Sequence, residues 1–284
     1  MSWFIERANK AIAVSATSDP ARSLVNAALQ NLRPRATSVA VATTLNVSGS
    51  EGNWLLRDQD TDRTWTIASS GGLIYQLTDR LMSGLAKVIE TQHCLHAAAV
   101  SINGNAIVMP AVSGSGKSSL AMWLVANGFD YISDEMVLID KDHRVDGISR
   151  PIHIKSHGWQ AIKHLLTNEN DIYDGKRVKV VPISSINGQV SSENTHETGI
   201  LLFPRFESGA STTLTRISAA QAGLALIRNH INARNMPHHG FSNLMQFART
   251  SQSYSLIFGD CRSLSHSLAT DLMRLTSDRT KLRR

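Results

Sequence analysis

The spacing of hydrophobic residues changes several times along the chain, and each change predicts a different kind of element. Residues 1 to about 35 are predicted to form one or two helices, because "DPARSLVNAALQNLR" opens with Asp19-Pro20 and continues with apolar residues at helical spacing. "TSVAVATTLNVSGS" and "NWLLRDQDTDRTWTIASS" are rich in Val, Thr and Trp and end in turn residues, which predicts about three short strands. "GGLIYQLTDRLMSGLAKVIE" then predicts a helix.

From residue 95 onward, short apolar runs alternate with helical segments. Strands are predicted for "CLHAAAVSI", "NAIVMPAV", "YISDEMVLID", "VDGISRPIHIKS", "TGILLFPRF" and "SYSLIFGD". The first two runs are separated by "NGN" at 103–105, which predicts a hairpin turn. Helices are predicted for "SSLAMWLVANGF", ended by Gly128, and for "GWQAIKHLLTNEN", "SAAQAGLALIRNHINARN" and "SLSHSLATDLMRLTSD".

The order of strand, glycine-rich loop, helix and strand is typical of an α/β unit that binds phosphate. We therefore expect two parts: a small α+β segment over residues 1–92 and an α/β domain over residues 93–284. No chemical motif occurs in residues 1–92, so this segment is expected either to recognise a partner or to extend the core structurally.

Composition narrows the class of protein. The chain has 284 residues, of which 42% are hydrophobic and 18% charged, as in ordinary soluble globular proteins. The formal net charge of +6 favours anionic partners such as nucleotides, although a merely basic surface would give the same value, and nucleic acid is not expected. Two cysteines form no disulfide framework, and no apolar run reaches 18 residues. These features predict a cytoplasmic protein without a membrane span.

The segment "AVSGSGKS" at 111–118 matches the phosphate-loop pattern G-x-x-x-x-G-K-[ST] at Gly116, Lys117 and Ser118, with Ala111 in place of the first glycine. Glycines allow the backbone to turn sharply, so that successive N–H groups meet phosphate oxygens at the positive end of the next helix. The alternative is a glycine-rich turn with a lone surface lysine. The residues predicted to contact a nucleotide are Ser113, Gly114, Ser115, Gly116, Lys117, Ser118 and Ser119.

Two further features could serve phosphoryl transfer. Asp134 and Glu135 interrupt the apolar run "YISDEMVLID", and adjacent carboxylates can divide proton acceptance and Mg²⁺ binding between them. A solvated acidic pair at a strand end is the alternative. His96 in "CLHAAAV" could face the transferred group, or it could be a core residue that hydrogen-bonds to the backbone.

A metal site at "HCLH" is not favoured, because no second His/Cys pair has suitable spacing. The base-reading segment N-K-x-D of GTPases and the L-S-G-G-Q signature of transporter ATPases are absent.

Taken together, "LHAAAV", "AVSGSGKSSLA" and "ISDEMVLI" resemble the HPr kinase/phosphorylase family and its HPr-kinase-related members, over roughly residues 94–160. The resemblance implies an α/β core with a mixed sheet, similar to that of phosphoenolpyruvate carboxykinase and distinct from purely parallel P-loop NTPases. It also implies a kinase that uses ATP and Mg²⁺ to phosphorylate a serine-like hydroxyl of a small protein or peptide.

By this resemblance, Lys117 and Ser118 hold phosphates and Mg²⁺, and Asp134 accepts the proton of the acceptor hydroxyl. Glu135 contributes to the metal, and His96 lines the transfer site. The resemblance also suggests phosphate or substrate contacts for Lys155 in "RPIHIKSHG" and Arg205 in "FPRF". A homo-oligomer is expected by the same analogy.

The sequence departs from the family pattern at several positions. Ser119 and Ser113 stand where acids are usual, the second member of the acidic pair is Glu135 rather than Asp, and the later Arg- and Glu-containing signature of dephosphorylation is missing. Phosphorylase activity and HPr as the substrate are therefore not expected. The alternatives are a nucleotide-binding regulator with little catalysis and an enzyme that phosphorylates a small metabolite. GTP or pyrophosphate remains open as the donor.

Overall fold

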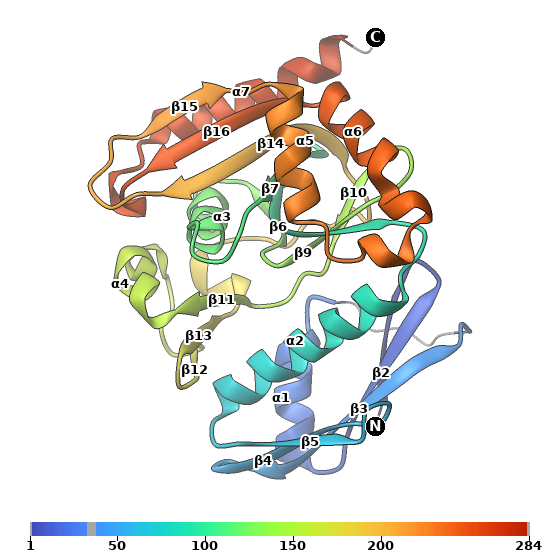
Figure 1. Ribbon diagram of the computed structural model, residues 1–284. Helices are drawn as coiled ribbons and strands as arrows, with labels where there is room; N and C mark the ends of the chain where they lie inside the picture. The colour runs from blue at the N-terminus through green and yellow to red at the C-terminus, as the bar shows by residue number, and fades with distance from the viewer. Residues whose placement is uncertain (1, 33–37, 283–284) are drawn as a thin grey trace.

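A computed structural model describes residues 2–32 and 38–282 and shows an α/β protein with mixed sheets (Figure 1). The N-terminal sheet has five strands in the order β1-β2-β3-β4-β5, and only β2 and β3 run parallel. The strands of this sheet are β1 (Ser2–Arg7), β2 (Lys10–Ala16), β3 (Val41–Ser50), β4 (Asn53–Asp58) and β5 (Arg63–Ile67), and the helices of the same region are α1 (Asp19–Leu29) and α2 (Ser70–Val88).

The prediction of a helix before residue 17 was wrong, because this stretch forms the hairpin of β1 and β2. Trp3 and Ile5 are buried while their neighbours are more exposed, which is the period-two pattern of a strand. Ala8 and Asn9 have φ of 49° and 62°, the left-handed values that a two-residue hairpin turn requires. The predicted helix from Asp19 and the three strands that follow it are confirmed; positions 33–35 of the predicted helical region lie outside the described residues.

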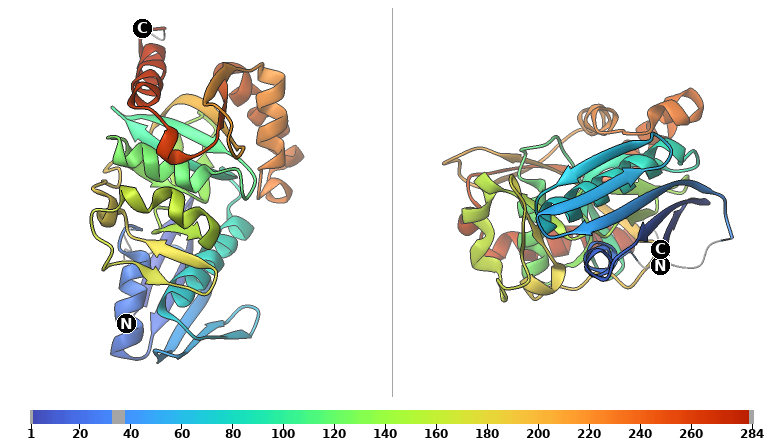
Figure 2. Two further views of the ribbon diagram at one scale, coloured as in Figure 1. Left: turned by 90° about the vertical axis from the view of Figure 1, so that its left-hand side faces the viewer. Right: turned by 90° about the horizontal axis from the view of Figure 1, so that it is seen from below.

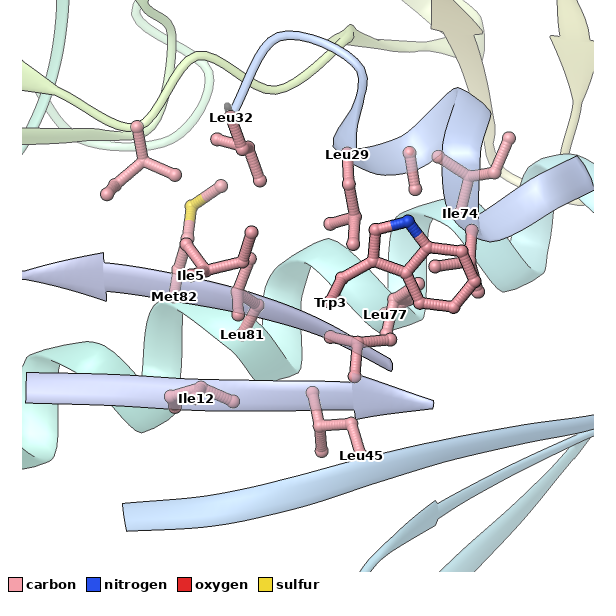
Figure 3. Packing of buried hydrophobic residues seen from close by; sticks show 14 of the residues in the cluster. Trp3, Ile5, Ile12, Leu29, Leu32, Leu45, Ile74, Leu77, Leu81 and Met82 are labelled. Carbon is pink, nitrogen blue, oxygen red and sulfur yellow. The ribbon is translucent and has the colours of Figure 1, made fainter. Parts of the chain in front are cut away.

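Helices α1 and α2 both pack on one face of the N-terminal sheet. Figure 3 shows Trp3, Ile12 and Leu45 from the strands beside Leu29 of α1 and Leu77 of α2. The same hydrophobic cluster also includes residues from beyond position 92, namely Cys94, Met136, Leu138, Ile148 and Val180. Residues on both sides of the predicted 92/93 boundary therefore share one core.

The central sheet is mixed, with the strand order β10-β9-β6-β7-β14-β16-β15 and with β8 also paired to β6. Strands β7, β14 and β16 run parallel to one another, and the other pairs are antiparallel. The predicted hairpin turn at 103–105 is confirmed between β6 and β7. The strands are β6 (His93–Ile102), β7 (Asn105–Pro110), β8 (Asp130–Ser133), β9 (Met136–Ile139), β10 (Val145–Gly147), β14 (Glu197–Phe206), β15 (Thr213–Arg216) and β16 (Gln252–Phe258).

Helices cover both faces of the central sheet, as the left view of Figure 2 shows. One face packs against α3 (Lys117–Ala126) and α7 (His266–Leu282), and the other against α5 (Ala219–Arg228) and α6 (Phe241–Thr250). Strand β6 is buried on both faces: Ala98 and Val100 join the α3 side, while Leu95 and Ala99 join the α5 side. This alternation directs His96 to the α3 side.

A small antiparallel sheet, in the order β11-β13-β12, lies between the central sheet and α2 (Figure 1). It consists of β11 (Ile152–Lys155), β12 (Tyr173–Asp174) and β13 (Val178–Val181). The remaining short elements are η1 (Ser156–Gly158), α4 (Trp159–Ile162), η2 (Lys163–Leu165), η3 (Ile183–Ile186), η4 (Ala233–Asn235), η5 (Pro237–Gly240) and η6 (Cys261–Ser263).

Several predicted helix lengths were wrong. "GWQAIKHLLTNEN" forms only the one-turn α4 and η2, because the backbone becomes extended at Leu166 (ψ 137°). The Asn168 side chain then accepts a hydrogen bond from the Asn170 N–H (2.9 Å) in a turn. Helix α5 ends at Arg228, where the Asn229 side chain bonds the Ala225 carbonyl (2.8 Å). Helix α6 was not predicted.

Two further sequence expectations concern cysteines and membranes. Cys94 and Cys261 are both buried and unbridged. Within residues 2–32 and 38–282, no helix has the length and apolar character needed to cross a membrane.

Candidate active site

The glycine-rich loop connects β7 to α3, as the sequence predicts. Gly114 and Gly116 have φ of 91° and 87°, values that residues with a side chain rarely adopt. Gly116 is the N-cap of α3 and offers no side chain to cap the helix. The first N–H groups of α3 therefore have no partner within the helix, and they form the positive end of its dipole. An anionic ligand is the natural partner of such a helix end.

The ends of two parallel strands hold this loop in place. The Phe206 N–H at the end of β14 donates to the Ser115 carbonyl (3.0 Å). A Cβ atom on Gly116 would lie 2.6 Å from Cζ of Phe258, the last residue of β16, and 3.3 Å from Cβ of Phe206. Glycine is thus required at position 116 both for its backbone angle and for the close approach of an aromatic ring.

Lys117 is the first residue of α3, and its amine points toward His96 and Glu135. The Lys117 Nζ lies 2.8 Å from His96 Nε2 and 3.9 Å from Glu135 Oε2. Its side chain is only 7% exposed. Burial lowers the pKa of Lys117, and the charges of Glu135 and then Asp134 act in the opposite direction.

Glu135 is the accessible member of the acidic pair, with a side chain that is 38% exposed. Its Oε1 lies 3.1 Å from His96 Nε2, and its Oε2 accepts a hydrogen bond from Arg150 Nη2 at 3.2 Å. Burial raises the pKa of Glu135, but the hydrogen bond from His96 and the charges of Arg150 and Lys117 together lower that pKa to about 2. This carboxylate is a strong ligand for cations and a weak proton acceptor at neutral pH.

The Nε2 atom of His96 faces both the amine of Lys117 and the carboxylate of Glu135. A neutral imidazole nitrogen either accepts a hydrogen bond or donates one, so it cannot accept fully from Lys117 and donate fully to Glu135 at the same time. If Lys117 turned toward a phosphate, His96 Nε2 would keep the Glu135 carboxylate as its partner, and because an ionised carboxylate only accepts hydrogen bonds, Nε2 would donate to it.

Asp134, the other acid of the pair, is completely buried. One oxygen, Oδ1, accepts from the Tyr131 hydroxyl (3.1 Å) and from Arg150 Nε (3.0 Å). The other, Oδ2, accepts from the His153 N–H (3.3 Å) and from Arg150 Nη2 (3.5 Å). In this arrangement, an acceptor hydroxyl has no free approach to the carboxylate that the sequence predicts as the general base.

A buried layer beneath the site comes from residues that were not predicted. Arg150 joins Asp134 and Glu135, and its Nη1 contacts Nδ1 of His153. His153 is buried, and burial followed by the charge of Arg150 lowers its pKa well below the usual value. Its ring packs against Tyr75 of α2 with ring centroids 5.1 Å apart. The signal for Arg150 was its position as a charged residue within the apolar stretch "GISRPIHI".

Lys155 and Arg205, the two weaker predictions, differ in outcome. The Lys155 amine donates to the Ser113 hydroxyl and so reaches the loop from β11. Arg205 lies at the end of β14 beside the loop, but its side chain is 69% exposed and pairs with Glu207. The structure therefore brings Lys155 to the loop and leaves the Arg205 side chain outside the cluster of His96, Lys117 and Glu135.

The donors around the loop suit a phosphate and a hard cation. Ser115 Oγ is buried without a hydrogen-bond partner among the described residues, so its hydroxyl is available for an anion. Ser118 is partly exposed in the first turn of α3, and Glu135 supplies a carboxylate; hydroxyl and carboxylate oxygens are ligands that Mg²⁺ accepts. Over the described part of the chain, no three His, Cys, Asp or Glu residues group as a protein-only metal site.

Comparisons with known proteins add little to this geometry. No protein-family model matches the chain, and no curated protein matches it. Among solved structures, the Hpr(Ser) kinase/phosphatase from Coxiella burnetii is similar at 12% identity, over 67% of this chain and 99% of that chain, with a TM-score of 0.29. With so low a TM-score, this distant similarity carries no argument about the activity of this chain.

Proposed function

We propose that this protein is a phosphotransferase that uses ATP and Mg²⁺ to phosphorylate a serine-like hydroxyl of a small protein or peptide. The observation that carries the proposal is the convergence of Lys117, His96 and Glu135 at the start of α3. A phosphate loop alone would fit many nucleotide-binding proteins. A histidine and a carboxylate within 4 Å of its lysine amine add the groups that proton transfer and metal binding require.

The loop supplies the nucleotide-binding groups. The N–H groups of Gly114 and of Gly116 to Ser119 and the amine of Lys117 would bind the phosphates, and Ser118 with Glu135 would hold Mg²⁺. Bound Mg²⁺ neutralises charge that develops on the transferred phosphoryl group. Lys155 is close enough to Ser113 to add a further cation at the loop. Such positioning and charge neutralisation make up most of what a protein contributes to phosphoryl transfer.

His96, oriented by Glu135, is the proton acceptor that the geometry favours. The imidazole is partly exposed, and the pKa of about 2 keeps the neighbouring Glu135 ionised at neutral pH. Because Nε2 donates its hydrogen to Glu135, the other imidazole nitrogen would take the hydroxyl proton while the new O–P bond forms, the bond from the γ-phosphorus to the bridging oxygen breaks, and ADP leaves. The carboxylate of Glu135 then stabilises the imidazolium, as carboxylates do in other acid–base pairs with histidine.

The sequence hypothesis instead assigns proton acceptance to Asp134. That assignment requires the carboxylate to leave Arg150 and Tyr131 and reach the surface of the site. The two assignments differ in their expected variants. If His96 is the acceptor, His96→Asn lowers the transfer rate by roughly 10²–10⁴-fold while nucleotide still binds. If Asp134 is the acceptor, His96→Asn leaves most of the rate intact.

Nucleotide binding is the first test. At about 100 times its dissociation constant, MgATP should stabilise the protein by roughly 2.7 kcal/mol in thermal unfolding. Lys117→Ala should abolish this shift, whereas Lys87→Ala, at an exposed position on α2, should retain it. Parallel titrations with MgGTP and with magnesium pyrophosphate identify the donor. A wild-type protein that none of the three stabilises would contradict the proposal.

Transfer itself is measured as ADP formation and as a mass increase of one phosphoryl group on a library of serine-containing peptides. Product on serine that is lost in Lys117→Ala supports the kinase. Binding of MgATP without product on any acceptor favours the nucleotide-binding regulator. Consumption of ATP only with added small hydroxy compounds favours a metabolite kinase.

A further inference from the structure

The outer side of α5 and the chain that follows it to α6 have an unusual surface composition. Residues 208–259 contain no Asp or Glu, although the chain as a whole has 23 acidic residues in 284. The same stretch has four arginines. The lack of acids therefore leaves its positive charge uncompensated by neighbours in sequence.

Large apolar side chains are also exposed here. Leu224, Ile227, Ile231 and Phe241 are each 39–54% exposed, and they make up half of the large exposed hydrophobic residues in the described chain. Leu224 and Ile227 lie on α5, while Ala222 and Leu226 on the same helix are buried against the sheet. Helix α5 thus has an apolar face toward the core and further apolar side chains toward solvent. Figure 1 shows α5 and α6 on the outside of the molecule.

The same segments also carry exposed cations. Arg228 and Arg234 are exposed near Ile227 and Ile231 in sequence, and Arg249 is exposed on α6. None of the three forms an ion pair with a residue in the described part of the chain. We call the surface formed by residues 224–241, with Arg249, the α5–α6 surface.

A cavity of about 270 Å³ opens in the same segment. Met236, Pro237 and Gly240 line one part of it, and His93 and Lys141 come from β6 and the turn after β9. The volume is sufficient for one large side chain but not for a nucleotide, since small-molecule pockets usually exceed 300 Å³. The exposed Phe241 lies between the lining residues Gly240 and Ser242, and an exposed apolar side chain next to such a cavity resembles a protein docking site, where one buried anchor supplies much of the affinity.

We propose that the α5–α6 surface binds an acidic segment of a partner protein, one that carries apolar side chains of which one enters the cavity. The unpaired arginines, in a stretch (residues 208–259) that contains no Asp or Glu, make an acidic partner complementary. They also disfavour a second copy of this surface, because the two-fold contact of a dimer would place arginines against arginines.

The α5–α6 surface is joined directly to the strand that carries His96. The Asn229 carbonyl accepts from the His96 N–H (2.8 Å), and the Ile231 N–H donates to the Cys94 carbonyl (2.8 Å). Asn232 also accepts from the Cys94 N–H (2.8 Å). These bonds fix the docking surface relative to the candidate active site. The docking proposal itself does not depend on kinase activity.

The test uses the full chain and a fluorescent 16-residue synthetic peptide with Leu at helical spacing and Glu at most other positions. Binding is followed by anisotropy. Leu224→Asn and Arg228→Glu should each weaken binding by roughly tenfold or more, as truncation of an interface anchor does. Val41→Asn and Arg63→Glu, at exposed positions of the N-terminal sheet, are the matched controls and should leave binding unchanged. Added salt should weaken binding, because it screens exposed charges.

Four results would overturn the proposal. They are no binding of the acidic peptide, equal binding of a peptide with Lys in place of Glu, equal weakening by the control variants, and concentration-dependent dimerisation that Leu224→Asn abolishes. Anionic phosphatidylserine vesicles provide a further comparison. Binding to vesicles but not to the peptide would assign the surface to a membrane instead. Unchanged thermal unfolding of each variant excludes misfolding as the cause.

Discussion

Asp134→Asn is expected to destabilise the protein strongly, even without any substrate. The carboxylate is fully buried and accepts hydrogen bonds from Tyr131, Arg150 and the His153 backbone. The variant leaves the guanidinium of Arg150, itself 4% exposed, with Glu135 as its only ionic partner among the described residues. Breaking a buried pair on one side costs about 3–5 kcal/mol. We expect about 3 kcal/mol, since Glu135 continues to compensate part of the charge.

Thermal and urea unfolding at pH 7 without nucleotide measure this loss. In a chain of this size, each kcal/mol lowers Tm by about 2–3 °C, so the shift should be about 6–9 °C. Asp130→Asn is the matched control, because Asp130 lies on the preceding strand, is partly exposed and forms no ion pair with any described residue. The double variant Asp134→Asn/Arg150→Met should be less destabilised than the sum of the single variants. Stability of Asp134→Asn within about 0.5 kcal/mol of wild type, the range of ordinary surface substitutions, would refute the reasoning.

Three further predictions concern the loop, pH and the cysteines. In urea unfolding, Gly116→Ala should destabilise the protein more than Gly114→Ala. Both positions have positive φ, but only a Cβ at position 116 would meet the aromatic ring of Phe258 on β16. Equal losses of stability in the two variants would contradict this account. Because the folded pKa of Glu135, about 2, lies below its unfolded value, its stabilising contribution is present above pH ~4.5 and is lost as pH falls toward 2. The stability difference between wild type and Glu135→Gln should shrink over that interval, and a constant difference would exclude the linkage. Burial raises the pKa of Cys94 and Cys261 to about 12, so a thiol reagent at pH 8 should label them only after unfolding, and rapid native labelling would contradict their burial.

The elements around the loop could be predicted because each leaves a local signal. Gly116 is needed for backbone geometry, and a strand and a helix flank the loop with distinct periodicities. The N-terminal hairpin could not be predicted in the same way. The stretch "KAIAVSA" is almost continuously apolar, and short apolar runs do not distinguish a strand from a helix by spacing. The decisive turn at Ala8-Asn9 contains only one residue typical of left-handed turns.

The sequence motifs indicate which residues of the candidate site lie together, but not what each of them contacts. The motif spacing indicates His96, Lys117 and Glu135, and the fold brings these three side chains together. The sequence gives no indication that Asp134 and Glu135 differ in exposure, because the difference arises at the turn between β8 and β9. There the Ser133 Oγ lies within hydrogen-bond distance of the carbonyls of Met136 and Ile148 (2.9 and 3.0 Å), to which its one O–H can donate, and this fixes the turn. Arg150 lies 16 residues along the chain, and only tertiary structure makes it the partner of both acids.

The N-terminal segment contributes to this same site through packing. Tyr75 on α2 contacts the ring of His153, whose other neighbour is Arg150, and Arg150 holds Glu135 beside His96. A displacement of α2 would loosen the support of His153 and, through Arg150, alter the position of the Glu135 carboxylate. The shared core strengthens this connection, because Leu77 and Leu81 of α2 belong to the same cluster as Met136 and Leu138 of β9. Of the two roles expected for residues 1–92, structural extension of the core therefore has direct support in the contacts, and it links the N-terminal sheet to the orientation of the acid that faces the phosphate loop.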